Sequence, residues 1–248
     1  MSGPLHQFQI EKIFPLEIAG YDVSFTNSAL YMSISILLAI SFLLLGARKK
    51  KLVPGKMQFI VEKCYLFIED MIDSNASSKA RGFIPFVFAL FFFIFVGNMI
   101  GMVPGAFTFT SHIIVTFAMA MIVFALVTLY ALFRHGLKYF SLFMPTGVPI
   151  LLAPIIIPIE ILSYLSRPIS LSIRLFANMM AGHTMLKVFA GFTATLGLAL
   201  GGLGYAIGIL PLILNIMIIA FEFLVAFLQA YVFTILTCIY IKDAIELH

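Results

Sequence analysis

The chain has 248 residues, of which 62% are hydrophobic and only 10% are charged, and its mean hydropathy is +1.11. A soluble domain carries about 25% charged residues, so this composition excludes a protein whose main solvent is water. The net charge of +4 is modest, and basic residues in such a chain indicate membrane orientation rather than nucleic-acid binding. The apolar residues extend over nearly the whole length. They predict one membrane domain, residues 1–248, of the all-α polytopic class.

The first 27 residues lack a long apolar core, so we expect a tail without a cleavable signal peptide. Residues 28–46 form the first apolar segment, which is long enough to cross about 30 Å of hydrocarbon. The basic run 48–51 follows at once, and the positive-inside rule places it in the cytoplasm. The tail is therefore predicted to lie outside, in the periplasm or its organellar equivalent.

Residues 54–80 are expected to form an amphipathic cytoplasmic connector. Pro54 suits a helix start, and apolar side chains recur at helical spacing through residue 72, with Gln, Glu, Lys and Asp between them. Such a helix lies on the membrane surface or docks against a partner, and the sequence leaves both readings open.

Two further spans are predicted, residues 83–103 returning outward and residues 111–133 coming back in. Arg134, His135 and Lys138 then form a second basic turn. Both basic clusters fall on the same side of the membrane, which supports the predicted orientation.

The last third contains two long apolar tracts, residues 146–200 and 203–241. The second would extend about 58 Å as one helix, nearly twice the hydrocarbon thickness. These tracts are therefore either strongly tilted or broken into hairpins, and we expect five to six helices, five crossings and a cytoplasmic C-terminus. Five prolines offer places for bends: Pro149, Pro154, Pro158, Pro168 and Pro211.

Few ionisable residues lie inside the apolar tracts: Glu160, Arg167, Arg174, His183, Lys187 and Glu222. An arginine near the middle of a membrane costs about 2.5–3.5 kcal/mol on insertion scales. We therefore interpret Arg174 as part of an ion-translocation path, in preference to a structural ion pair.

Helix geometry separates these residues into two polar faces. At about 100° per residue, Ser170 and Asn178 each lie about 40° from Arg174. His183 lies about 180° from Arg174, with Lys187 about 40° from His183. Two polar faces on one helix suggest that it separates two polar compartments.

Glu222 and Gln229 lie about 20° apart around the last helix, on one face. Glu222 paired with His183 would form a proton-exchanging carboxylate–imidazole pair, because histidine titrates near neutrality. The alternative is that Glu222 neutralises Lys187 or Arg174 as a structural bridge.

The stretch SRPISLSIRLFANMMAGH at residues 166–183 resembles the signature of subunit a of the rotary F-type ATP synthase. Further matches are PIE at 158–160, VGNMIGMVP at 96–104 and EFLVAFLQAY at 222–231. The resemblance covers most of the chain from about residue 80.

The resemblance implies that Arg174 is the essential arginine facing a rotating ring of c subunits, with Asn178 and Gln229 as its polar neighbours. It also implies that His183 and Glu222 line the aqueous access path. The full set expected along the proton path is Glu222, His183, Glu160, Gln229, Asn178, Ser170, Lys187 and Tyr231.

Many bacterial relatives in this family have a carboxylate at the position of His183 and a histidine at the position of Glu222. The opposite arrangement here resembles mitochondrial members and points to an alphaproteobacterial or organellar source. The resemblance therefore implies the bacterial inner membrane, or alternatively the mitochondrial inner membrane.

The resemblance further implies two offset half-channels and a hairpin, residues 146–241, that packs two long tilted helices against the c-ring. Its implied partners are that ring, b-type peripheral stalk subunits, the F1 sector and membrane lipid, with no nucleic acid. We expect no cofactor and no metal, and the chain itself should not bind nucleotide.

Two other classes of protein fit less well. A secondary transporter or stand-alone channel often shows internal repeats, and the two halves of this chain differ in helix length and polar content. A membrane-embedded enzyme is disfavoured because no H-E-x-x-H, G-x-S-x-G or P-loop motif occurs. The five histidines are too scattered to suggest a metal cluster.

Overall fold

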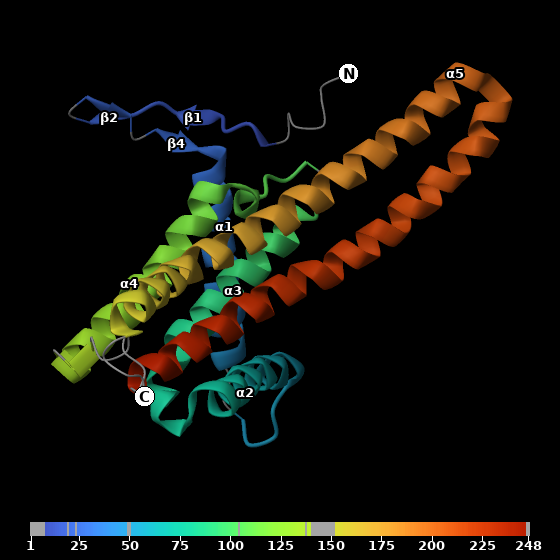
Figure 1. Cartoon of the computed structure of the whole chain (residues 1–248). Helices are drawn as coiled ribbons and strands as arrows, with labels where there is room; N and C mark the ends of the chain where they lie inside the picture. Colours follow the sequence, from blue (N-terminus) through green and yellow to red (C-terminus); the bar gives the residue numbers. More distant parts are fainter. Residues whose placement is uncertain are drawn as a thin grey trace. The chain divides into compact units, whose positions relative to one another are not determined.

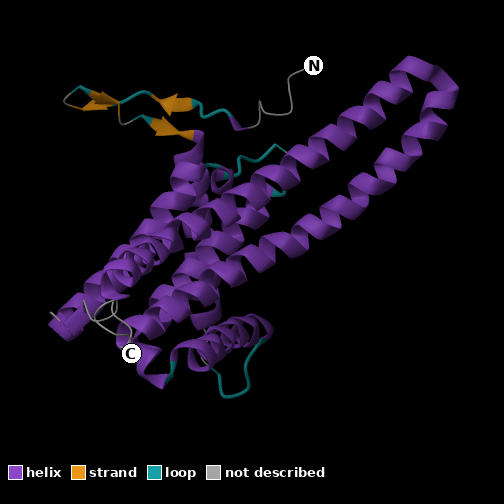
Figure 2. Ribbon diagram, viewed as in Figure 1, coloured by secondary structure: helices purple, strands orange, loops and turns teal. Residues whose placement is uncertain are grey.

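The computed structural model describes residues 8–18, 20–22, 24–48, 51–103, 105–136, 138–139 and 152–246. Within these ranges helices dominate, and strand occurs only in the segment before α1 (Asn27–Ala47), as Figure 2 shows. Five helices are long and apolar enough to cross a membrane, which confirms the all-α polytopic class. They are Asn27–Ala47, Lys79–Gly101, Ile113–His135, Ala153–Leu198 and Ile207–Ile245.

The chain forms two compact units. Unit 1 comprises Met1–Leu38, Phe93–His112 and Leu175–Ala230. Unit 2 comprises Ala39–Phe92, Ile113–Arg174 and Tyr231–His248. Three helices contribute residues to both units: α1, α3 (Ile84–Gly101) and α5 (Ala153–Ile245).

Short hairpins precede α1 in unit 1, in the segment that the sequence predicted only as a tail. Strand β1 (Lys12–Phe14) pairs antiparallel with β4 (Phe25–Thr26), and β2 (Glu17–Ile18) pairs with β3 (Tyr21–Asp22). Gly20 adopts a φ of 81°, which a tight hairpin turn requires and glycine permits.

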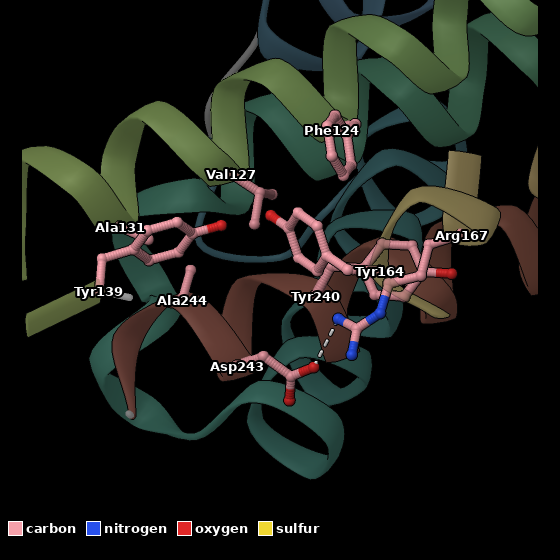
Figure 3. A pocket seen from close by; sticks show the side chains of 9 residues that line it. All are labelled: Phe124, Val127, Ala131, Tyr139, Tyr164, Arg167, Tyr240, Asp243 and Ala244. Carbon is pink, nitrogen blue, oxygen red and sulfur yellow. Dashed lines mark hydrogen bonds and ion pairs between the residues drawn. The ribbon is translucent and has the colours of Figure 1, made fainter. Parts of the chain in front are cut away.

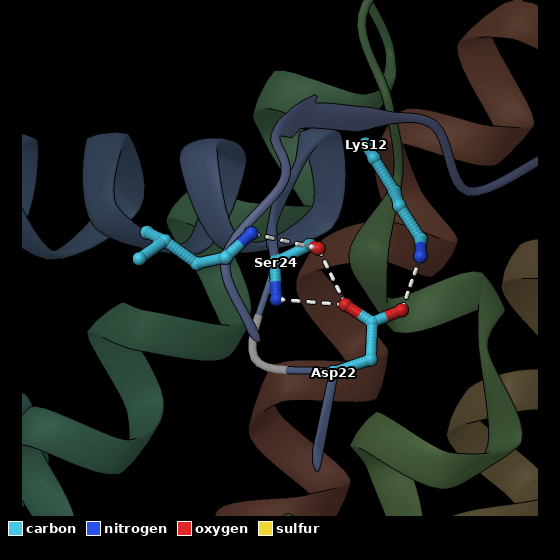
Figure 4. Close-up of polar contacts among 4 residues, drawn as sticks. Lys12, Asp22 and Ser24 are labelled. Carbon is cyan, nitrogen blue, oxygen red and sulfur yellow. Dashed lines mark hydrogen bonds and ion pairs between the residues drawn. The ribbon is translucent and has the colours of Figure 1, made fainter. Parts of the chain in front are cut away.

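A polar cluster fixes these hairpins (Figure 4). Lys12 forms an ion pair with Asp22, and the backbone N–H of Ser24 donates to Asp22 Oδ1 at 3.1 Å. The hydrogen bond from Lys12 lowers the pKa of Asp22 to about 2. The Asp22 carboxylate therefore stays charged at any physiological pH.

In unit 1 the two arms of α5 (Ala153–Ile245) lie side by side, and the orange part of this helix turns back on itself (Figure 1). Each apolar tract is one continuous helix, Ala153–Leu198 and Ile207–Ile245, and the turn lies between them, so neither tract is itself broken into a hairpin. Three interior prolines, Pro158, Pro168 and Pro211, lie within helix rather than at a break. Pro149 and the start of the predicted hairpin, residues 146–151, lie outside the described residues.

Unit 2 contains the amphipathic helix α2 (Lys56–Ala76), followed by η2 (Ser78–Phe83) and the first part of α3 (Ile84–Gly101). One face of α2 is buried through Ile68, Met71, Ile72 and Ala76. Arg81 Nη2 lies 2.7 Å from Asp73 Oδ2, and this ion pair joins η2 to the end of α2.

Helix α4 (Ile113–His135) completes unit 2 together with the remaining parts of α1 (Asn27–Ala47) and α5. It ends at His135 and is followed by Gly136, whose φ of 57° is the left-handed conformation that commonly closes a helix. Arg134 and His135 occupy its last turn, where cations stabilise the negative end of the helix dipole.

Candidate functional site

A buried carboxylate–imidazole pair lies at the centre of unit 1. His183 Nδ1, on the first arm of α5, is 3.2 Å from Glu222 Oε1 on the second arm. His183 is 7% exposed and Glu222 only 2%. Few side chains of this chemistry are buried without a partner, because an isolated charge in an apolar interior is strongly disfavoured.

Thr108 completes this pair from the connector that follows α3. Its Oγ1 lies 3.1 Å from His183 Nε2, so both ring nitrogens of the imidazole have a polar neighbour. A hydroxyl donates or accepts, and it therefore suits either tautomer of the ring. The arrangement allows a proton to enter at one ring nitrogen and leave from the other without movement of the backbone.

Gly182 makes room for the Glu222 carboxylate against the first arm. A Cβ added at this position would lie 2.7 Å from Glu222 Oε1 and 3.0 Å from its Cδ. Any larger residue must displace the carboxylate, so the glycine beside His183 is part of the site.

Gly182→Val is expected to lower the proton conduction that the resemblance implies, and to destabilise the packed arms by about 1–3 kcal/mol, as overpacking does. The measurement is proton flux in vesicles that contain the whole complex, with heat-induced dissociation of the complex as the second readout. Gly191→Ala on the same arm is the matched control, because no atom lies within 4 Å of its added Cβ. Equal flux in the two variants would show that the close approach is unimportant.

Asn98 ties α3 to the second arm of α5 beside the pair. Its Nδ2 donates to the Ala226 carbonyl at 3.1 Å, and its Oδ1 accepts from Thr110 Oγ1 at 2.8 Å. Asn98 is fully buried, and Ala226 lies one helical turn after Glu222. Sequence reasoning assigned no role to Asn98, although an amide inside an otherwise apolar span was a usable signal.

A cavity of about 690 Å³ in unit 1 reaches this site. Its polar lining includes Thr108, His183, Lys187 and Asn215. His183 lines this cavity, and Glu222, whose Oε1 lies 3.2 Å from His183 Nδ1, is not among the described lining residues. Water in this cavity would therefore contact the imidazole of His183.

Arg174 belongs to unit 2 and lies near the middle of the first apolar arm. Its side chain is exposed, and within the described residues it has no hydrogen bond and no ion pair. Ser170 is likewise exposed, and Glu160 is partly exposed. The guanidinium is therefore available to an anion outside this chain.

Arg167, seven residues before Arg174, is held tightly in unit 2 (Figure 3). Its Nη1 donates to Asp243 Oδ2 at 2.8 Å. Its Cζ lies 5.2 Å from the ring centroids of both Tyr164 and Tyr240. We call Arg167, Asp243, Tyr164 and Tyr240 the clasp, because these side chains join the start of α5 to its end.

The clasp is expected to show a coupling energy of about 1 kcal/mol between Arg167 and Asp243. Arg167→Gln and Asp243→Asn should each lower the temperature at which the solubilised complex dissociates. The double variant should dissociate no earlier than the worse single variant, because both remove the same interaction. Arg134→Gln is the control, and strictly additive shifts would contradict the clasp.

The structure brings only part of the predicted site together. Asn178, Gln229, Glu160 and Ser170 form no hydrogen bond or ion pair within the described residues. Tyr231 lies against Phe67 of α2, with ring centroids 5.9 Å apart. No three His, Cys, Asp or Glu side chains gather as a metal site would require in the described part of the chain.

These features define a polytopic α-helical membrane protein with a buried carboxylate–imidazole pair and an exposed arginine in an apolar span. A model of the family described as "ATP synthase A chain" matches residues 29–242. The chain belongs to this family. Membership supports a role in proton transport and ATP synthesis.

Relatives described as "ATP synthase subunit a" match nearly the full chain. That of Parvibaculum lavamentivorans is 54% identical, over 98% of this chain and 93% of its own length. The relative from Rhizobium leguminosarum bv. trifolii is 52% identical, over 99% of this chain and 98% of its own length. The relative from Rhizobium etli is 51% identical, over the same shares of the two chains. These relatives are alphaproteobacterial, in agreement with the resemblance drawn from the His183 and Glu222 positions.

Proposed function

We propose that this chain conducts protons through two offset half-channels of the Fo sector and exchanges them with carboxylates on a ring of c subunits. Arg174 separates the two half-channels, and passage of protons around the ring drives rotation and ATP synthesis. The proposed setting is the bacterial inner membrane, with the N-terminus periplasmic and the C-terminus cytoplasmic.

The observation that supports this function most strongly is the exposed Arg174 side chain in an apolar span. A cation at lipid depth is costly unless an anion faces it. Since no described residue of this chain supplies that anion, a second subunit must do so. A ring carboxylate that is neutral in lipid and ionised opposite Arg174 meets this requirement.

Arg174 suits a barrier because its guanidinium does not deprotonate at accessible pH. It attracts the ring carboxylate and promotes release of the proton from that carboxylate. It cannot accept the proton and pass it to the other half-channel. Direct leak is thereby blocked, and the proton must travel with the ring.

One of the two half-channels is proposed to lie in unit 1, on the basis of the cavity, His183 and Glu222. Water in the cavity exchanges protons with the imidazole, and Glu222 takes them at 3.2 Å. The membrane potential supplies about 2.3 kcal/mol per charge per 100 mV, so several protons are needed for each ATP.

The test is ATP-driven and potential-driven proton flux in vesicles that contain the whole complex, with substitutions at Arg174 and Glu222. Co-purification of this chain with a small hairpin subunit, b-type stalk subunits and soluble ATPase subunits tests the proposed partners. Purification as an active channel without them would overturn the proposal in favour of a stand-alone channel.

A further inference from the structure

A basic cavity of about 390 Å³ lies at the end of α1 in unit 2, and the proposed proton path does not use it. We propose that it binds the phosphate headgroup of an anionic phospholipid. The residues that line it come from the end of α1, the following loop and the start of α2: Leu45, Gly46, Arg48, Lys51, Gly55, Lys56, Met57 and Gln58.

The charge of this cavity is entirely positive. Arg48, Lys51 and Lys56 line it, no acidic residue does, and none of the three has an ion-pair partner among the described residues. Glu62, one turn after Gln58 on α2, accepts a hydrogen bond at its Oε1 from Gln58 Nε2 at 2.7 Å. Three cations gathered without an anion favour a ligand that carries negative charge.

Contacts of described residues shape one side of the cavity. Gln58 Oε1 accepts from the Lys51 N–H at 3.2 Å, and Gln58 Nε2 donates to the Lys51 carbonyl at 3.2 Å. A Cβ at Gly46 would overlap the Val61 side chain, so α1 approaches α2 closely here. The backbone that carries Lys51 is therefore held at the start of α2.

The start of α2 adds to the attraction of an anion. The helix begins at Lys56 after Gly55, and neither a capping side chain nor an acidic residue neutralises its first turn. Free N–H groups and the positive end of the helix dipole thus lie on the same side as the three cations.

The apolar neighbours distinguish a lipid from free phosphate. The cavity follows directly on a candidate membrane span that ends at Ala47. Leu52 is fully exposed and Val53 is 83% exposed in the loop beside it. Exposed aliphatic side chains next to clustered cations match the boundary between acyl chains and headgroups. A bound lipid would therefore hold α2 on the membrane surface, which is one of the two readings that the sequence left open.

The experiment uses the whole complex in phosphatidylcholine nanodiscs that contain a trace of photoreactive phosphatidylglycerol. Illumination should label residues 45–58, and unlabelled phosphatidylglycerol should compete. Each cation is expected to contribute about fivefold in affinity for the headgroup. The variant Arg48→Gln/Lys51→Gln/Lys56→Gln should therefore need on the order of 100-fold more photoreactive phosphatidylglycerol to reach the same specific labelling, meaning the labelling that the unlabelled lipid removes. Lys63→Gln is the matched control, since Lys63 lies over the Phe59 ring on α2 and does not line the cavity.

Three results would overturn the proposal. Equal competition by phosphatidylcholine would show unspecific lipid contact, and displacement by millimolar inorganic phosphate would show a site for free phosphate. Labelling of the triple variant at the level of Lys63→Gln would show that the cations do not bind the headgroup. If the triple variant fails to assemble, Lys51→Gln alone should still weaken labelling about fivefold, and unchanged labelling would count against the site.

Discussion

Arg174→Ala is expected to abolish ATP synthesis driven by a proton gradient, while the complex still assembles. The exposed guanidinium has no hydrogen bond and no ion pair among the described residues, so its removal breaks neither kind of contact there. In the proposed mechanism the cost falls on the ring carboxylate, which loses the cation that allows it to ionise inside the membrane. The measurement is ATP synthesis and ATP-driven proton pumping in vesicles.

Arg134→Gln is a suitable control, because Arg134 is an exposed cation in the last turn of α4. It should assemble and pump as the unsubstituted chain does. Arg174→Lys should also fail, since an ammonium can lose its proton when desolvated and offers a leak that arginine does not. Normal pumping by Arg174→Ala would remove the basis of the proposed mechanism.

Glu222→Gln is expected to lower proton flux by on the order of 100-fold. This is the lower end of the decrease in rate that follows removal of a positioned acid–base group. The amide keeps the shape of the side chain against Gly182 but cannot carry a proton. Passive proton flux through vesicles stripped of the soluble ATPase sector measures this step without the rest of the cycle.

The exchanged pair His183→Glu/Glu222→His should recover a large part of that flux. It retains one carboxylate and one imidazole at positions whose contacting atoms lie 3.2 Å apart. Both single variants, His183→Glu and Glu222→His, should conduct less than the double variant. If Glu222→Gln conducted like the unsubstituted chain, Glu222 would have only a structural role.

Length and hydropathy by themselves determined where the helices lie. The predicted span 28–46 corresponds to α1 at Asn27–Ala47, and the predicted span 111–133 corresponds to α4 at Ile113–His135. This agreement has a physical reason, since the hydrocarbon thickness fixes how many apolar residues a helix needs. The arginine motif around Arg174 was likewise sufficient to indicate the family, which the relatives confirm.

The partner of Glu222 was decided only by the tertiary structure. Sequence periodicity left His183, Lys187 and Arg174 as alternatives, and the described structure joins Glu222 to His183. The choice depends on where α5 turns back, because this sets the register between its two arms. One residue more or less in that turn would rotate the second arm by about 100° and move Glu222 away from Gly182. Periodicity along one helix contains no information about that register. Contacts between residues 39 positions apart, such as His183 and Glu222, define it.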